Sequence, residues 1–94
     1  MVLQTAGTSA SFNYPSGITT DGTNLYVVDS NNHLIRKIVI STGAVTTVAG
    51  TGSAGSANGT GTSASFYYPR AITTDGTNLY VADTNNNRIR KIVL

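Results

Sequence analysis

Short runs of β-branched and aromatic residues alternate with polar, turn-forming residues along this chain. β-Branched and aromatic side chains favour strands, and Asp-Gly and Asn-Asn pairs favour turns, so the pattern predicts strands separated by tight turns. In the first half of the chain the predicted strands are 17–20, 25–28, 34–40 and 44–49. Residues 50–65 are rich in Gly, Ser, Thr and Ala and predict a long connection. No window has the helical period of about 3.6 residues, so the predicted fold class is all-β.

The chain contains the same unit twice. Residues 7–40 and 61–94 are identical at 26 of 34 positions. Four antiparallel strands followed by a long return loop are typical of one β-propeller blade. The third predicted strand carries apolar residues on both faces, among them Ile35 and Ile38, which favours blades that stack face to face. We therefore predict two four-stranded antiparallel blades per chain. Their core is expected to consist of apolar residues of the second and third strands: Leu25, Val27, Ile35, Ile38, Leu79, Val81, Ile89 and Ile92.

The motifs of both units resemble the NHL repeat. The first unit carries YPSGI at 14–18, LYVVD at 25–29 and NNHLIRKI at 31–38. The second unit carries LYVAD at 79–83 and NNNRIRKI at 85–92. The resemblance implies a β-propeller, and NHL propellers close with about six blades. This chain departs from that pattern because it has two units.

The first residues repeat the end of the first unit, since VLQTAGT at 2–8 aligns with VTTVAGT at 45–51. We expect a stray outer strand at 2–7, blade one at about 12–50, and blade two at about 66–94, completed by an outer strand such as 2–7. Such a chain is expected to be a designed or excised two-blade fragment. It is expected to close into a full propeller by homo-oligomerisation, with three chains (six blades) favoured and four chains (eight blades) as the alternative.

Composition also favours association between chains. A chain of 94 residues buries a modest core, and small all-β domains usually need disulfides, a metal or partner subunits. There is no Cys, no Glu and one His, so disulfides and a His-rich metal cage within one chain are excluded. The net charge of +2 is too small for a nucleic-acid stripe. No apolar run is long enough for a membrane span, and we expect no signal peptide.

Catalytic and metal chemistry lack the residues that they need. His33 lies in a turn with only Asp29 nearby in sequence, and we interpret it as a solvated turn residue. The Asp29 and Asp83 turns lack the Gly and Glu of a calcium-binding EF-hand loop. The glycines of 50–61 are not followed by the Lys of a phosphate-binding loop. We therefore predict no catalytic residue, no metal and no cofactor.

The basic residues form the candidate binding surface. They are Arg36, Lys37, Arg70, Arg88, Arg90 and Lys91. The family resemblance implies RNA binding as one use of such residues, because the NHL domains of some regulators bind RNA on a basic face. Arginines inside strands more often lie along blade interfaces or pair with acids such as Asp29 and Asp83. Nucleic acid is therefore not expected as a partner.

Aromatic residues precede the first strand of each unit. They are Phe12, Tyr14, Phe66, Tyr67 and Tyr68. We interpret them as packing between blades, and a ligand groove lined by them is the alternative.

Three functions compete at this stage. The favoured one is a non-catalytic, self-assembling propeller scaffold or interaction module whose partner is the chain itself. The alternative is a ligand-binding domain that takes RNA, peptide or glycan on the loop face of the ring. The third is a fragment of an NHL-like metal-dependent lyase or hydrolase, which the single His and the absence of Glu disfavour.

Overall fold

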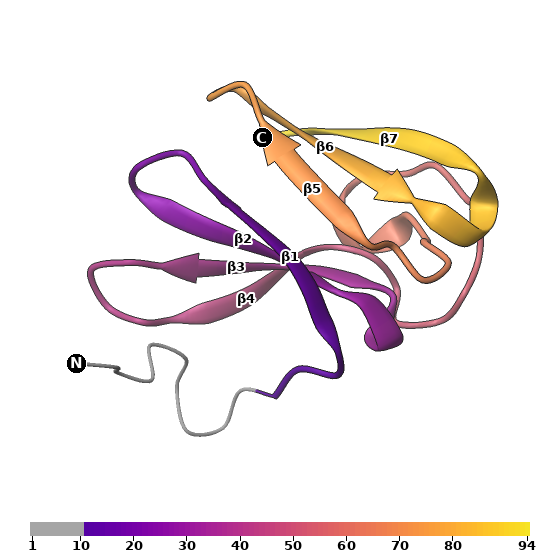
Figure 1. Cartoon of the computed structure of the whole chain (residues 1–94), viewed down its shortest axis with the longest axis horizontal. Helices are drawn as coiled ribbons and strands as arrows, with labels where there is room; N and C mark the ends of the chain where they lie inside the picture. Colours follow the sequence, from indigo (N-terminus) through magenta and orange to yellow (C-terminus); the bar gives the residue numbers. More distant parts are fainter. Residues whose placement is uncertain (1–10) are drawn as a thin grey trace.

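The computed structural model describes residues 11–94, which form two antiparallel β-sheets (Figure 1). The first sheet has the order β1-β2-β3-β4 and the second has the order β5-β6-β7. The strands are β1 (Pro15–Thr20), β2 (Asn24–Asp29), β3 (Leu34–Val39), β4 (Val45–Ala49), β5 (Ala71–Thr74), β6 (Asn78–Asp83) and β7 (Arg88–Val93). Three short 3-10 helices lie between strands: η1 (Ser30–Asn32), η2 (Gly61–Ser63) and η3 (Thr84–Asn86). None of the helices within 11–94 is long and apolar enough to cross a membrane.

The first sheet confirms the predicted blade. Each predicted strand of the first unit is present, and its bounds move by at most two residues. The second sheet has three strands in the part of the chain that the structure describes. The predicted completing strand, 2–7, lies outside the described residues. The observed architecture is therefore all-β, with one blade of four strands and one of three.

Each blade has two unlike ends. At the hairpin end, residues 21–23 join β1 to β2 and residues 75–77 join β5 to β6. At the tyrosine end lie the residues that precede or begin the first strand of each blade, namely 13–16 and 67–70, together with the turns η1 and η3. The hairpin ends of the two blades have the same turn residues, whereas the sequences of the tyrosine ends differ.

The core lies between the two sheets. Its buried members are Tyr26, Val28, Ile35, Ala49, Ala64, Phe66, Leu79 and Val81. The buried residues of the first sheet point to the same side of that sheet, which we call face A. Val28 pairs with Ile35 and Ile35 pairs with Ala49, and the side chains of paired residues lie on the same face. Leu79 and Val81 lie on the other side of the second sheet, face B, since side chains alternate along a strand. Face A of blade one therefore packs against face B of blade two.

The two blades lie close together at Gly17, where β1 lies beside β5. A Cβ at this position would lie 3.3 Å from the Cα of Ala71 and 3.3 Å from the carbonyl oxygen of Arg70. The hydroxyl of Ser16 donates a hydrogen bond to that same carbonyl at 2.9 Å. The absence of a side chain at Gly17 therefore sets the spacing between the inner strands.

The predicted core residues behave differently in the two blades. Val27, Ile35, Ile38, Leu79 and Val81 are buried as expected, and Leu25 and Ile92 are half-buried. Ile89 was expected in the core but is 74% exposed, whereas its repeat counterpart Ile35 is fully buried. The difference arises because face A of blade two has no neighbouring sheet within residues 11–94.

Candidate interaction surfaces

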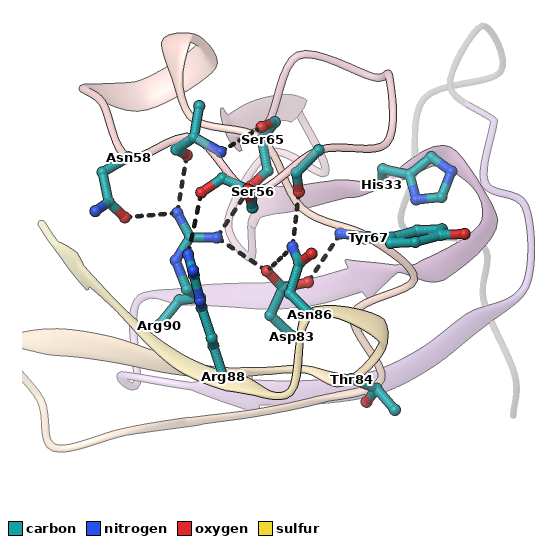
Figure 2. A network of polar contacts seen from close by, with 12 residues as sticks. His33, Ser56, Asn58, Ser65, Tyr67, Asp83, Thr84, Asn86, Arg88 and Arg90 are labelled. Atoms are coloured by element: carbon teal, nitrogen blue, oxygen red, sulfur yellow. Dashed lines mark hydrogen bonds and ion pairs between the residues drawn. The ribbon is translucent and has the colours of Figure 1, made fainter.

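A buried ion pair organises the tyrosine end of blade two (Figure 2). Asp83, at the end of β6, is fully buried and accepts a hydrogen bond from the guanidinium of Arg90 on β7 at 2.9 Å. The other carboxylate oxygen accepts from the backbone N–H of Tyr67 at 2.8 Å. The side-chain amide of Asn86 also donates to Asp83 at 2.8 Å. A buried carboxylate requires such partners. Asp83 therefore holds the segment before β5, through Tyr67, and the turn after β6, through Asn86.

Arg90 also ties the long connection to the second sheet. Its guanidinium donates to the carbonyls of Ser65 at 3.0 Å and Ala57 at 2.9 Å, and to the side-chain oxygen of Asn58 at 2.8 Å. The same group stacks 5.1 Å from the ring centroid of Phe66. The sequence alone gives no sign that residues 57–65 hold this arginine, because nothing local links them to β7.

The same cluster recurs in blade one. Arg36 donates to the buried carboxylate of Asp29 at 3.4 Å and lies 5.3 Å from the ring centroid of Phe12. Asp29 also accepts hydrogen bonds from the side-chain amide of Asn32 at 2.9 Å and from the backbone N–H of Asn13 at 2.7 Å. The expected pairing of strand arginines with Asp29 and Asp83 is confirmed. The cluster is an architectural unit that each repeat encodes once.

The six basic residues predicted as a binding surface lie on separate parts of the molecule. Arg36 and Arg90 lie in the two ion pairs, the latter buried. Lys37 pairs with Tyr26 and Lys91 with Tyr80 on face A of the two blades. Arg88 is exposed at the start of β7, where it donates to the carbonyl of Ser56 at 3.4 Å. Arg70 is exposed at the tyrosine end, just before β5. The six do not form one basic face.

The outer sides of the two blades are open and apolar. Face B of blade one presents an apolar groove of about 430 Å³. Its lining consists of Phe12, Pro15, Ser16, Gly17, Ile18, Val27 and Ile38. Face A of blade two presents the exposed side chains of Ile89 and Val93. Exposed apolar area of this kind marks a contact site in soluble proteins.

The hairpin end carries a second repeated motif. The carboxylate of Asp21 accepts the backbone N–H groups of Asn24 at 2.8 Å and Thr23 at 2.9 Å, and these bonds lower the pKa of Asp21. Asp75 accepts the N–H groups of Asn78 and Thr77 in the same way, with the same effect on its pKa. Both aspartates are exposed, so this end of the molecule carries the accessible negative charge.

His33 is not the solvated turn residue that the sequence suggested. It is half-buried at the junction of the blades, where its Nδ1 accepts the backbone N–H of Tyr68 at 3.0 Å. Its ring meets that of Tyr68 edge to face at 4.5 Å. His33 caps η1 in the left-handed conformation, which turns its ring towards blade two. Its contact partner is 35 residues away, so no local signal identified it.

The aromatic residues before β1 and β5 divide into two groups. Phe66 is buried between the blades, as expected. Tyr14 was also expected to pack between blades but is 62% exposed, and Tyr67 is exposed as well. Tyr14 and Tyr67 lie on segments that pass out to the surface of the tyrosine end, whereas Tyr68 is half-buried against His33 of the other blade. No three His, Cys, Asp or Glu side chains gather as a metal site among residues 11–94.

Comparisons with known proteins agree with this architecture. The NHL repeat matches residues 12–38 and 66–92. NHL repeat-containing protein 2 of Bos taurus is 41% identical over 93 residues, covering 94% of this chain and 13% of that protein. Protein SUPPRESSOR OF QUENCHING 1, chloroplastic, of Arabidopsis thaliana is 42% identical over 92 residues, covering 94% of this chain and 8% of that protein.

Two solved structures from Bacteroides thetaiotaomicron share the fold. A structural genomics protein of unknown function has a TM-score of 0.84 and 36% identity, over 89% of this chain and 22% of that one. An auxiliary nutrient binding protein has a TM-score of 0.76 and 27% identity, over 92% of this chain and 24% of that one. The chain thus spans less than a quarter of each of these relatives. Because the NHL match includes both repeats and more than half of the residues, the chain belongs to the NHL repeat family.

Proposed function

We propose that this chain is a non-catalytic interaction module that associates head to tail with copies of itself. The observation that supports the proposal is that the two open faces are the counterparts of the two faces buried in the blade–blade junction. Within the chain, Ile35 on face A packs against the cluster of Leu79 and Val81 on face B. Ile89 and Ile18 are the repeat counterparts of Ile35 and of Ile72, which packs against the same core, and they are exposed on the open faces.

Head-to-tail contact brings these open faces together in the same way. Tyr80, Ala82 and Ile89 of one copy fill the groove that Ile18, Val27 and Ile38 line in the next copy. Such contacts are heterologous, and they close into a ring when the rotation between subunits permits. Three chains give six blades, the number usual in the family, and four chains give eight. The contact removes two apolar faces from water, which favours assembly.

The outer edge of β7 supports the same arrangement. A groove of about 680 Å³ follows this edge and is lined by residues 58–61 and 88–93, among others. In blade one the equivalent edge of β3 is paired with β4. A strand with the pattern of β4 would complete blade two, and residues 2–6 of the same or a neighbouring copy have that pattern. This completion is part of the proposal.

Two matched variants test the head-to-tail contact. Ile18→Asp places a charge on open face B, and Ile89→Asp places one on open face A; both residues are exposed, so the folded chain tolerates them. Sedimentation equilibrium is expected to give a closed oligomer for the parent chain and a 9.7 kDa monomer for each variant alone. An equimolar mixture is expected to form a dimer, because each variant retains one intact face. A parent chain that remains monomeric at micromolar concentration contradicts the proposal.

A further inference from the structure

The two repeats differ almost entirely at the tyrosine end. Eight positions differ between residues 7–40 and 61–94. Seven of them lie where β1 and β5 begin, where β2 and β6 end, or where β3 and β7 begin: 13, 16, 17, 28, 30, 33 and 34, with their counterparts 54 residues on. The hairpin end keeps its turn residues 21–24 and 75–78 unchanged. The differences are therefore concentrated at the surface of the tyrosine end and just beneath it, where Val28 is fully buried.

This surface contains a polar pocket between the two blades. Its volume is about 300 Å³, and it is lined by Tyr14, Ser30, Asn31, Tyr68, Arg70 and Asn85. The lining combines a guanidinium, two amides, two phenols and a hydroxyl, and it includes no carboxylate. It therefore offers an excess of hydrogen-bond donors, which suits a ligand that supplies acceptors.

Two tyrosines of the pocket have a constrained backbone. Tyr14 has a φ of 57° and Tyr68 a φ of 46°, in the left-handed region that non-glycine residues rarely adopt. The bond from Tyr68 N–H to His33 Nδ1 holds the second of these in place. Residues kept in such conformations cluster at binding sites, where the strain fixes side chains in advance.

Ser30 adds a buried group without a partner. The residue is 1% exposed, and its hydroxyl makes no hydrogen bond within residues 11–94. Its counterpart Thr84 is exposed and donates to the carbonyl of Ala82. A buried hydroxyl that lacks a partner is costly, and a ligand oxygen in the pocket is one way to satisfy it.

All four aspartate side chains are engaged away from Arg70. Asp29 and Asp83 are buried in ion pairs, and Asp21 and Asp75 are held at the hairpin end. Arg70 consequently has no carboxylate partner within residues 11–94, and residues 1–10 contain no acidic side chain. A ligand carboxylate at the tyrosine end would meet this guanidinium without competition from the protein's own acids.

We propose that the tyrosine-end pocket binds an acidic peptide, with one carboxylate side chain held by Arg70. The amides of Asn31 and Asn85 donate to its remaining lone pairs, and the tyrosine rings cover its aliphatic stem. The pocket volume accommodates one such side chain. An RNA strand is disfavoured because Arg36 and Arg90 are engaged in the ion pairs, which leaves too few free cations to follow a phosphate backbone.

The chain itself provides matched variants for the test. Arg70→Ser gives position 70 the residue that blade one carries at 16, and Arg88→Leu gives position 88 the residue that blade one carries at 34. Both remove one positive charge from an exposed site, but only Arg70 lines the pocket. Binding is measured by fluorescence anisotropy with a short peptide of alternating Glu and Ser. A Gln-for-Glu peptide and a single-stranded RNA of equal charge are the comparison probes.

Arg70→Ser is expected to weaken binding of the Glu peptide about tenfold, the loss typical of a charge-assisted hydrogen bond, whereas Arg88→Leu changes it less than about twofold. The Gln peptide is expected to bind far more weakly than the Glu peptide. Equal losses from the two variants, equal binding of the two peptides, or tighter binding of RNA would overturn the assignment. Sedimentation of Arg70→Ser should match the parent chain, so failure of this site is separable from failure of head-to-tail association.

Discussion

The same sequence unit has two different environments in this molecule. Ile35 and Ile89 occupy equivalent positions of their blades, yet one is fully buried and the other is 74% exposed. Tyr26 is buried, whereas Tyr80 is half-buried. Nothing in the strand itself differs at these positions, so burial in this fold is decided by the presence of a neighbouring blade. A blade is therefore an incomplete folding unit, as in other repeat architectures.

The largest expected effect concerns the buried ion pairs. Asp83→Ala leaves the buried Arg90 without its carboxylate, and such a loss typically costs about 3–5 kcal/mol of unfolding free energy. Asp29→Ala is expected to cost less, because Arg36 lies farther from its partner, at 3.4 Å, and is 15% exposed. Urea denaturation of the two variants measures the comparison. A larger loss for Asp29→Ala would show that the acceptors of the long connection satisfy Arg90 even without Asp83.

The two isoleucines give a direct comparison of the blades. Ile35→Ala opens a cavity in the junction and is expected to lower the unfolding free energy by about 2–5 kcal/mol. Ile89→Ala removes an exposed side chain and is expected to change the stability of the single chain by less than about 0.5 kcal/mol. Urea denaturation at a concentration where the chain is monomeric tests both. Equal losses would mean that face A of blade two is covered within one chain.

The histidine at the junction has a smaller expected effect. His33→Ala leaves the N–H of Tyr68 without its acceptor and is expected to cost about 1–3 kcal/mol. His33→Asn, which introduces the residue of blade two, keeps an amide oxygen at this turn and should recover part of that loss. Amide hydrogen exchange at Tyr68 reports the bond directly. Unchanged protection in His33→Ala would mean that the contact does not hold the junction.

The smallest expected effect is at the hairpin end and depends on pH. The pKa of Asp21 and of Asp75 is lowered in the folded chain, first by backbone N–H groups, from the ordinary value of 3.8. Their contribution to stability is therefore present above this value and lost as the pH falls through the lower folded pKa. The double variant Asp21→Asn with Asp75→Asn is expected to flatten the acid limb of a thermal stability profile. An unchanged acid limb would mean that Asp21 and Asp75 do not set the acid sensitivity of the fold.

The elements of this fold were predictable because their signals are local. The strands followed from β-branched runs and from turns such as Asp21-Gly22. The pairing of Arg36 with Asp29 was one of two expectations for an arginine inside a strand, next to a position along a blade interface. The role of His33 was not predictable, because its partner Tyr68 belongs to the other blade. The exposure of Ile89 was missed for the same kind of reason, since it depends on what lies beyond the second sheet.

The close approach at Gly17 has a geometric consequence for any ring built from these blades. The angle between neighbouring blades is that of a wedge, and it narrows when the inner strands move apart while the outer strands stay in place. Ala71, the repeat counterpart of Gly17, carries the methyl group that Gly17 lacks. In a head-to-tail ring, the junction in which Ala71 takes the place of Gly17 would thus be held wider near the axis than the junction within the chain. The number of blades in a closed ring is then set by two wedge angles that alternate around the axis. Gly17→Ala, which adds one methyl group, would narrow the angle within the chain and raise the number of blades.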